Sequence, residues 1–587
     1  MIAVTVVEVR ESTVGSARAH TRAETGVVAI PDRTEVLIAG GGPVGLATAV
    51  ELGRRGIECV VVEPRATVSH ARPRCKTVNI RTMEHLRRWG IAQRLRERAP
   101  LPVSFSQDIV FCTSLAGHEL SRFHGVLGLA AEGDRSAELG QQSPQYVLEE
   151  LLREVVTETP TATLLIGWRV TALDQDDDGV RVRIADEAGS SATIACAHVV
   201  GCDGARSVVR DAIGAEYVGE RALAPNFGMV FRAPGLLERT AHGPAVQYWI
   251  LNRAAPALMG PIDRDGTWWL IALGVDRATG EAQAPEIIRA AAGMELDVTV
   301  LSHDPWTARM QLVDRLRDRR VFLAGDAAHL NPPFGGHGLN TGIGDAVDLG
   351  WKLAAALRGW GGPRLLDSYE AERRPIQTRV IAAAAANNRV LATDLLSDGV
   401  DVEGPPGDSA RHAAGERIQA AKRAEFHALS LVLDLAYEGS PVIESHGHGR
   451  PLADDDEPVV EARAGARLPH AWIAPDRSIY DELGDGLTLL ALVDDADPGC
   501  GAFERAARAR GLPLRIVHRC EPALRARYGA AAVLVRPDQH VAWCGNDLPD
   551  DCGALLDLVR GMEPSPPGAA GPSATAAASR ASTATTL

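Results

Sequence analysis

The most constraining feature of this sequence is an apolar run that leads directly into a glycine-rich turn. Residues 34–39 (TEVLIA) are followed by GGGPVG at 40–45, and a second apolar run ends at Glu63. A continuous apolar run before a glycine turn is typical of a parallel strand that is buried on both faces. The order of strand, glycine turn, helix and strand predicts a βαβ unit over residues 34–63, and hence an α/β fold.

The turn has the spacing Gly-x-Gly-x-x-Gly, which suits nucleotide phosphates. The first glycine permits the tight turn, the second lets the backbone approach a pyrophosphate, and the third lets helix and strand pack closely. The N-terminus of the helix then offers N–H groups and the positive end of its dipole. An acid 18 residues after the last glycine stands where a ribose-binding carboxylate belongs. The residues predicted to bind a dinucleotide are Gly40, Gly42, Val44, Gly45 and Glu63.

A second motif lies almost 300 residues downstream. The apolar run 321–323 enters AGDAAH at 324–329, and PPFGGHGLN at 332–340 then leads into a helix. The two motifs suggest one long cofactor held at both ends, with FAD as the candidate. Asp326 would accept hydrogen bonds from ribityl hydroxyls. The N–H groups of Gly338, Leu339 and Asn340 would face the flavin N1–C2=O edge and stabilise the negative charge of reduced flavin.

Composition excludes several classes of function. No apolar run approaches the roughly 20 residues of a membrane span, and the N-terminus lacks the pattern of a secretory signal. The formal charge of −15 argues against a nucleic-acid partner. The nine cysteines are irregularly spaced without a CxxC, which supports neither a disulfide framework nor a zinc site. We therefore expect a cytoplasmic protein without a structural metal.

Composition and periodicity also predict the domain organisation. The expected segments are an N-terminal arm (1–33), the first part of an FAD-binding domain (34–220), a middle antiparallel-sheet substrate domain (221–315), the second part of the FAD-binding domain with helices (316–395), a linker and helical segment (396–459), a C-terminal domain (460–562) and a disordered tail (563–587). Within the fifth segment, the Gly/Pro/Asp-rich stretch 396–415 is predicted to be a linker or loop.

Three motifs together resemble a known family. VVGCDGARSVVR at 199–210 resembles the Asp-Gly motif of group A flavoprotein monooxygenases, and AGDAAHLNPP resembles their second FAD motif. With the glycine turn, the motifs occur in the order of that family, which includes para-hydroxybenzoate, phenol and aromatic-polyketide hydroxylases. The resemblance covers about residues 34–392. It implies a Rossmann-like FAD-binding domain of the para-hydroxybenzoate hydroxylase fold with an inserted antiparallel-sheet substrate domain.

The resemblance also implies roles for single residues. Arg74 and Gln145 match residues that contact FAD, and a surface salt bridge is the alternative for Arg74. Asp203 matches the organiser of the Asp-Gly loop. Arg210 matches an arginine for NAD(P)H by spacing, and a surface ion pair is the alternative. His337 stands where many relatives have Gln, and a solvent-facing loop histidine is the alternative there.

The implied reaction is oxygen transfer to an aromatic ring. NADPH or NADH would reduce FAD, O₂ would form a C4a-hydroperoxide, and its distal oxygen would go to a phenolic or fused-ring polyketide-type substrate. No second Gly-x-Gly-x-x-Gly is well placed, which fits a reductant that visits and leaves. The cofactor carries the chemistry, so no catalytic acid or base is named. A Baeyer–Villiger-type oxygenase on the same scaffold is the alternative, and a non-catalytic flavin-binding interaction protein is a remote one.

The substrate is expected between the flavin and the middle sheet. The candidates by region are Tyr248, Trp249, Trp268, Trp269, Pro332 and Pro333. Neighbours in a strand face opposite sides, so at most one residue of each aromatic pair should line the pocket, and core packing is the alternative for each.

Residues 460–560 resemble the thioredoxin-like domain of phenol and polyketide hydroxylases. GARLPH at 465–470 opens the domain and VRPD at 535–538 lies in a predicted hairpin. Without a CxxC the domain should be redox-inactive. We expect a structural or homodimer-contact role, and a small aromatic substrate and O₂ as the chain's other partners.

Overall fold

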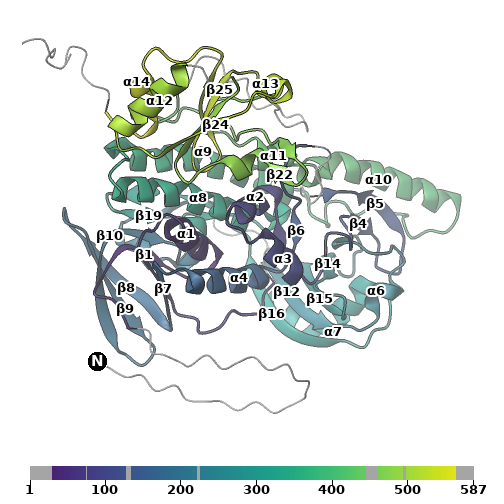
Figure 1. Ribbon diagram of the computed structural model, residues 1–587. Helices are drawn as coiled ribbons and strands as arrows, with labels where there is room; N and C mark the ends of the chain where they lie inside the picture. Colours follow the sequence, from purple (N-terminus) through teal and green to yellow (C-terminus); the bar gives the residue numbers. More distant parts are fainter. Residues whose placement is uncertain are drawn as a thin grey trace, which may run out of the picture. The chain divides into compact units, whose positions relative to one another are not determined.

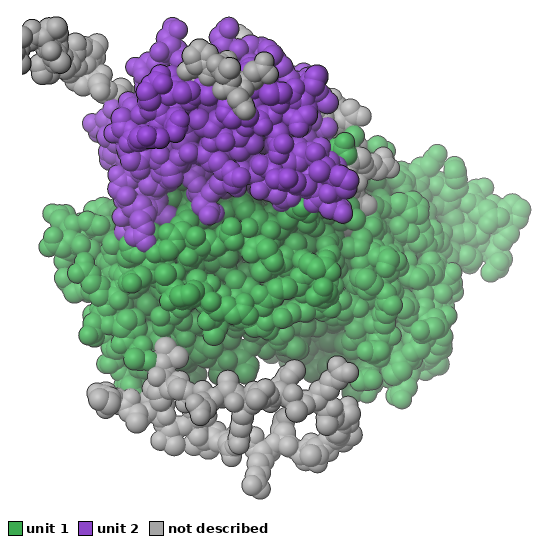
Figure 2. Space-filling model, viewed as in Figure 1, with its two compact units in different colours: residues 1–351, 374–433, 455–458 green, residues 352–373, 434–454, 459–587 purple. Residues whose placement is uncertain are grey.

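The computed structural model describes residues 29–73, 76–126, 134–220, 225–444, 461–493 and 498–563. Nearly all of the predicted arm and tail, and Arg74, lie outside these ranges. The chain forms two compact units, coloured separately in Figure 2. Unit 1 comprises residues 1–351, 374–433 and 455–458, and unit 2 comprises residues 352–373, 434–454 and 459–587. None of the helices within the described ranges is both long and apolar enough to span a bilayer.

A mixed sheet with a parallel centre, built around β1 (Arg33–Ala39), organises unit 1. β1 lies between β2 (Cys59–Glu63) and β10 (Ser191–Gly201), and β10 also pairs with β19 (Val321–Leu323), all in parallel. The side chains from Val36 to Ala39 are fully buried, as a central parallel strand requires. The remaining strands are β7 (Ala162–Ile166), β8 (Trp168–Gln175), β9 (Val180–Asp186) and β18 (Arg317–Asp318). The predicted βαβ unit and the α/β class are confirmed.

Helix α1 (Pro43–Gly53) connects β1 to β2 and packs against α4 (Gln145–Glu158) (Figure 1). The shorter helices of unit 1 are α2 (Ile80–Arg88), α3 (Ala92–Arg98), α5 (Val208–Ala212), α6 (Leu236–Arg239) and α11 (Leu429–Leu433), with 3-10 turns η2 (Gly204–Arg206), η3 (Gly325–Ala327) and η4 (Phe334–Gly336). The long helices α8 (His337–Leu357) and α9 (Pro363–Asn388) each contribute residues to both units.

A second, seven-stranded sheet lies in the region predicted to bind substrate. Its strands, in sheet order, are β16 (Thr299–Thr307), β12 (Pro225–Arg232), β15 (Thr267–Leu273), β14 (Ala257–Pro261), β13 (Gln247–Ile250), β4 (Ile109–Cys112) and β5 (Glu119–Phe123). All neighbours are antiparallel except β13 and β4. The hairpin β4–β5 comes from the segment assigned to the FAD-binding domain, so a boundary at residue 221 does not enclose the whole sheet.

Small sheets complete unit 1. They are formed by β11 (Tyr217–Glu220), β17 (Met310–Val313) and β20 (His329–Leu330), and by β3 (Thr77–Val78) and β6 (Gln141–Gln142).

The two faces of the seven-stranded sheet form separate cores. One face packs against α7 (Arg277–Ala292). The other packs against Phe334 of η4 and against α10 (Pro405–Phe426). The predicted linker over 396–415 is therefore wrong from Pro405 onward. Its two prolines stand in the first helical turn, where a missing N–H costs nothing, so they mark a helix start rather than a loop.

Unit 2 contains a four-stranded sheet, in the order β24 (Leu514–His518), β23 (Leu487–Ala491), β25 (Ala532–Val535) and β26 (Val541–Gly545). Its helices are α12 (Pro498–Ala509), α13 (Pro522–Tyr528) and α14 (Cys552–Val559), and β21 (Trp472–Ala474), β22 (Arg477–Ser478) and η5 (Ile479–Glu482) precede them. The strand–helix–strand pattern and the hairpin around Asp538 are confirmed.

Candidate functional site

Four predicted motifs lie at the carboxyl ends of four neighbouring parallel strands. In sheet order, β19 leads to Asp326, β10 leads to Asp203, β1 leads to Gly40, and β2 ends at Glu63. Ligands of open α/β sheets bind at this edge, where successive connections leave in opposite directions. The topology therefore gathers segments distant in sequence into one candidate site.

Each of the three glycines of the first turn suits its position for a different structural reason. Gly40 has φ +99°, and a Cβ there would lie 2.4 Å from the Cys202 carbonyl oxygen. A Cβ on Gly45 would lie 2.0 Å from the Gly40 oxygen. Gly42 has φ −77°, which any residue adopts, and a Cβ there would meet nothing within 4 Å. The protein itself does not require glycine at 42, so the open space there fits close backbone approach by a pyrophosphate.

Val44 packs the first motif against the second. A Cβ on Gly325 would lie 2.9 Å from Val44 Cγ2, and one on Gly342 would lie 2.5 Å from it. Both glycines thus allow the start of α1 to contact the turn that carries Asp326.

Glu63 is held rigidly beside the glycine turn. It is buried, and its Oε2 accepts a hydrogen bond from the Gly41 N–H at 2.8 Å. Its Oε1 accepts from the Arg65 N–H at 2.8 Å and from Arg65 Nε at 2.7 Å. A carboxylate with this fixed orientation suits the predicted ribose contact, which remains a proposal.

Asp203 organises its own loop. Its carboxylate accepts hydrogen bonds from Ser207 Oγ at 2.5 Å, Val208 N at 2.8 Å and Val209 N at 3.2 Å. Burial raises the pKa of Asp203, although these hydrogen bonds oppose the shift. The side chain therefore fixes the turn between β10 and α5, and its predicted effect on a cofactor would act through that turn.

Arg210 braces the Asp-Gly loop against the Asp326 turn. Its guanidinium donates to the Ala205 oxygen and to Asp211 Oδ1, both at 3.1 Å, and lies 4.3 Å from the centroid of the Tyr217 ring. The Tyr217 hydroxyl donates to the Asp326 carbonyl oxygen. Arg210 is 8% exposed, so the side chain is engaged within the protein, and its contact with NAD(P)H stays a prediction.

Asp326 presents an exposed carboxylate between two buried neighbours, Gly325 and Ala327. Within the described ranges, that carboxylate makes no hydrogen bond or ion pair. An open acceptor at a strand end suits ribityl hydroxyls.

Sequence reasoning missed Asp345, the group that fixes the Asp326 turn. Asp345 is fully buried, and its Oδ2 accepts from the Gly325 N–H at 3.1 Å and lies 2.9 Å from His329 Nε2. Its Oδ1 accepts from Gln377 Nε2 at 3.1 Å. The available signal was an acid inside the largely apolar helix that follows residue 340.

The loop at 332–340 turns on two glycines in left-handed conformations, Gly335 (φ +80°) and Gly336 (φ +66°). Helix α8 begins at His337, so the N–H groups of 338–340 belong to its first turn and lack helical partners. A Cβ on Gly338 would meet nothing within 4 Å. This open helix start fits the negatively charged edge of a reduced flavin.

The side chain of Asn340 clamps this loop, a role the sequence did not reveal. Its Oδ1 accepts from the Asn79 N–H at 3.0 Å and from Thr82 Oγ1 at 2.8 Å. Its Nδ2 donates to the Thr77 oxygen at 3.0 Å and to the Gly336 oxygen at 2.7 Å. All four hydrogen-bonding positions of the amide are used, which fixes the start of α8 against β3 and α2.

His337 is not a solvent-facing histidine. Its side chain is 5% exposed, and its Nε2 has no hydrogen-bond partner. Burial lowers the pKa of His337 to about 4, so the ring is neutral at physiological pH. The alternative of a solvent-facing loop residue is therefore wrong.

Of the other two predicted FAD contacts, only Gln145 lies within the described residues. Gln145 begins α4, and its backbone N–H donates to the Pro73 oxygen at 3.0 Å. Arg74 follows Pro73 and lies outside the described residues, so its role stays a prediction. The role of the Gln145 side chain is likewise a proposal.

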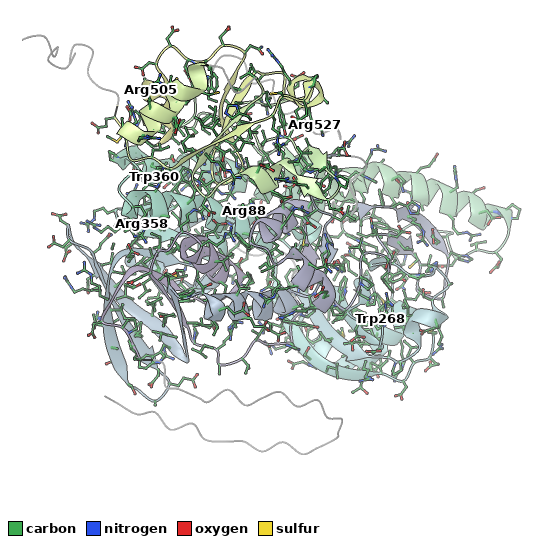
Figure 3. All side chains as sticks on the ribbon, viewed as in Figure 1. Arg88, Trp268, Arg358, Trp360, Arg505 and Arg527 are labelled. Atoms are coloured by element: carbon green, nitrogen blue, oxygen red, sulfur yellow. The ribbon has the colours of Figure 1, made fainter. Side chains whose placement is uncertain are left out.

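The aromatic candidates divide between the two faces of the seven-stranded sheet. Tyr248 and Trp268 lie in the core beside α7 (Figure 3 labels Trp268), and the Tyr248 hydroxyl donates to the Gly243 oxygen. Trp249 and Trp269 lie on the opposite face together with Phe334. This placement agrees with the expected alternation and removes Tyr248 and Trp268 from the pocket we propose.

The face with Trp249 and Trp269 also carries polar groups. Both indole N–H groups are buried without a partner, and Lys76 Nζ lies 3.7 Å from the Trp269 ring centroid. Pro332 is buried and Pro333 is exposed at the start of the adjoining loop. The indole of Trp268 also lacks a partner, so an unpaired N–H alone does not mark a substrate contact.

An edge of this kind is typical of nucleotide-binding α/β proteins, and a separate sheet beside it is found in FAD-dependent oxidoreductases. The comparisons with known proteins make the class specific. Residues 33–384 match the FAD binding domain family, and residues 461–561 match the family of the aromatic-ring hydroxylase C-terminal domain. The chain is 32% identical over 551 residues to a putative polyketide hydroxylase of Streptomyces halstedii, covering 87% of this chain and 93% of the relative.

Solved structures agree. RebC with bound 7-carboxy-K252c superposes with a TM-score of 0.83 at 36% identity, over 91% of this chain and 100% of that chain. Aklavinone-11 hydroxylase in complex with FAD and aklavinone superposes with a TM-score of 0.77 at 28% identity, over 90% and 99%. The chain therefore belongs to the group A flavoprotein aromatic hydroxylases. It is a flavin-dependent monooxygenase whose cofactor is FAD.

Proposed function

We propose that this monooxygenase hydroxylates a phenolic or fused-ring, polyketide-type aromatic compound. The observation that carries the proposal is the apposition of the aromatic face, Trp249 and Trp269, to Phe334 of the loop that ends in the open start of α8. Aromatic side chains gathered beside this loop favour a flat apolar ring as the neighbouring substrate. The names of the relatives, a polyketide hydroxylase and aklavinone-11 hydroxylase, support the same class.

The residues of the chain would bind and orient the cofactor. The backbone at 40–45 would hold the pyrophosphate, Glu63 the ribose, and Asp326 the ribityl chain. The first-turn N–H groups of α8 would stabilise negative charge on the isoalloxazine edge. When bound, FAD supplies the electron transfer from NAD(P)H and the activation of O₂.

The remaining residues would provide geometry and exclude water. Asn340, Asp345 and Asp203 fix the loop before α8, the Asp326 turn and the Asp-Gly loop, so each binding group would be positioned before the cofactor arrives. No acid or base of the chain is assigned a proton transfer. A cytoplasmic location and a homodimer stay predictions.

The test is a screen of purified holoenzyme with NADPH and NADH against phenol and 1,8-dihydroxyanthraquinone. We expect NAD(P)H oxidation that an aromatic compound stimulates, and a product with one added hydroxyl on an intact ring. NMR of the product separates this outcome from Baeyer–Villiger insertion, which leaves a lactone or ester of the same mass as the hydroxylated ring. A protein that binds no FAD would overturn the proposal, as would oxidation that no aromatic compound alters.

A further inference from the structure

Helix α10 carries a buried ion pair that the cofactor site does not use. Lys422 is 0% exposed and Glu425 is 2% exposed. Lys422 Nζ donates to Glu425 Oε2 at 2.7 Å, one turn along the helix, and to the Asn387 carbonyl oxygen at 3.3 Å. Two opposite charges are thus enclosed on the helix that covers the sheet face with Trp249 and Trp269, here called the substrate face.

The ammonium of Lys422 lies against Trp249. Nζ is 4.3 Å from the centroid of that ring, a distance typical of a cation–π contact. The Trp249 ring also packs on Phe111 at 5.1 Å, Phe334 at 6.2 Å and Phe426 at 6.3 Å between centroids. One indole therefore joins the ion pair to the loop that leads into α8.

Phe334 belongs to the loop at 332–340, here called the flavin loop, so the Trp249 ring contacts this loop directly. Phe334 begins η4, and Gly338 follows four residues later. Helix α10 itself packs against η4. A shift of the Trp249 ring would therefore be transmitted to Phe334, because packed interiors leave little free volume.

Stability alone is a weak reason to enclose this pair. Burial lowers the pKa of Lys422 and raises that of Glu425, which shows that each charge is costly where it lies. Replacement of a buried ion pair by apolar residues is often neutral or stabilising. The geometry offers another reason, since the ammonium holds one aromatic ring of the substrate face in a single orientation.

We propose that Lys422 is a positioning residue for oxygen transfer: held by Glu425, its ammonium fixes the Trp249 indole and, through Phe334, the spacing between the substrate face and the flavin loop. The inference rests on the proposed function. In the coupled reaction, substrate, O₂, NAD(P)H and a proton give hydroxylated substrate, NAD(P)⁺ and water. When the spacing is wrong, NAD(P)H, O₂ and a proton give NAD(P)⁺ and hydrogen peroxide.

The decisive variant is Lys422→Met combined with Glu425→Leu. Lys422→Met alone leaves a buried unpaired carboxylate, so it should lower both stability and coupling. The double variant removes both charges, and its melting temperature should return to within about 4 °C of the wild type. We expect its positioning defect to persist, and Lys422→Arg to restore the wild-type behaviour because the cation remains.

Two readouts report position rather than folding. The visible circular dichroism of bound FAD reports the geometry of the flavin loop without turnover. The ratio of hydrogen peroxide formed to NADPH consumed, with 1,8-dihydroxyanthraquinone as the probe, reports coupling. Both should change in the double variant, the peroxide ratio several-fold. Trp249→Phe should reproduce the change, and Trp268→Phe, on the other face of the sheet, should not.

Each outcome is decisive. A double variant with wild-type dichroism and peroxide ratio would overturn the role of Lys422 while leaving the monooxygenase intact. A wild-type protein without bound FAD would instead overturn the proposed function. Equal effects of Trp249→Phe and Trp268→Phe would show that the indole contact of Lys422 has no special role.

Discussion

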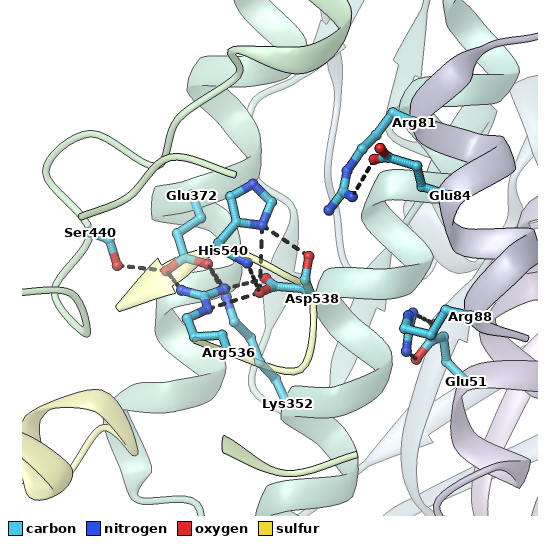
Figure 4. A network of polar contacts seen from close by, with 10 residues as sticks. All are labelled: Glu51, Arg81, Glu84, Arg88, Lys352, Glu372, Ser440, Arg536, Asp538 and His540. Atoms are coloured by element: carbon cyan, nitrogen blue, oxygen red, sulfur yellow. Dashed lines mark hydrogen bonds and ion pairs between the residues drawn. The ribbon is translucent and has the colours of Figure 1, made fainter. Parts of the chain in front are cut away.

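Two carboxylates, Asp326 in unit 1 and Glu372 in unit 2, lie in opposite environments. At the strand ends of unit 1, the carboxylate of Asp326 is exposed, and Gly42 and Gly338 face open space. In unit 2, the carboxylate of Glu372 is fully buried and surrounded by cations (Figure 4). The exposed carboxylate of Asp326 is available to bind a ligand, whereas the buried carboxylate of Glu372 binds other side chains and stabilises the fold.

The network of unit 2 is fully satisfied. Arg536 donates to both Glu372 oxygens, at 2.6 and 2.8 Å, and to Asp538 Oδ2 at 2.6 Å. Lys352 Nζ lies 2.5 Å from Glu372 Oε2, and Ser440 Oγ donates to Oε1 at 2.6 Å. Although burial alone would raise the pKa of Glu372, Arg536 and Lys352 hold it well below its usual range. The hairpin motif VRPD is thus an anchor for helices α8 and α9, and nothing about it suggests a ligand.

The largest effect is expected from Arg536→Met. The substitution leaves Glu372 and Asp538 as buried charges without their main partner, which should lower the free energy of unfolding by about 3–5 kcal/mol. Urea unfolding measures this change. Arg508→Met is the control, because the one ion pair of Arg508 among the described residues is an exposed pair with Glu504, and its effect should stay within about 0.5 kcal/mol. Equal losses of unfolding free energy in the two variants would show that the buried network stabilises the protein no more than an exposed ion pair does.

The next effect concerns two glycines of one turn. Gly42→Val should leave the apoprotein stable, because its Cβ meets no atom within 4 Å. It should weaken FAD binding by about 100-fold, or about 2.8 kcal/mol, by blocking the pyrophosphate. Gly45→Ala should instead destabilise the apoprotein, since its Cβ would lie 2.0 Å from the Gly40 oxygen. Fluorescence titration of apoprotein with FAD, beside thermal unfolding, separates the two, and a stable Gly45→Ala protein would contradict this division.

A smaller effect should appear with pH at His337. The pKa of His337 is about 4 in the folded protein and 6.5 in the reference state. Because the folded pKa is lower, the contribution is fully present above about pH 6.5 and is lost as pH falls toward 4. Between pH 7 and pH 5 it should cost about 2 kcal/mol of stability. His337→Gln should lose less stability over that interval in urea unfolding at the two pH values; an unchanged pH dependence would place the titrating group elsewhere.

The smallest effect is expected at the open carboxylate. Asp326→Ala should weaken FAD binding by about tenfold, because charged hydrogen bonds to the ribityl hydroxyls are lost in an exposed position. Asp326→Asn keeps an acceptor and should lose less. Equilibrium titration with FAD is the measurement, and wild-type affinity in the Ala variant would remove Asp326 from the site.

Local sequence determined much of this arrangement. A buried strand, a glycine turn and an acid at a fixed distance are short-range features, so the positions of Gly40, Glu63 and Asp326 at strand ends could be predicted. The clamp made by Asn340 could not, because its partners Asn79 and Thr82 lie more than 250 residues away. Asp345 and Lys422 also act through tertiary contacts, to Gly325 and Trp249, although their partners lie closer in the sequence. The start of α10 was missed because its prolines also suit a loop.

The alignment of motifs at four strand ends has a consequence for how the protein folds. Groups that would touch one cofactor are spread over residues 40–340, so the binding site exists only after β19 has joined β10. Contacts of such long range form late and slowly. A cofactor that binds only the completed sheet stabilises it by mass action. Bound FAD would therefore also report complete folding of unit 1. A chain truncated before residue 340 should bind no FAD and stay colourless.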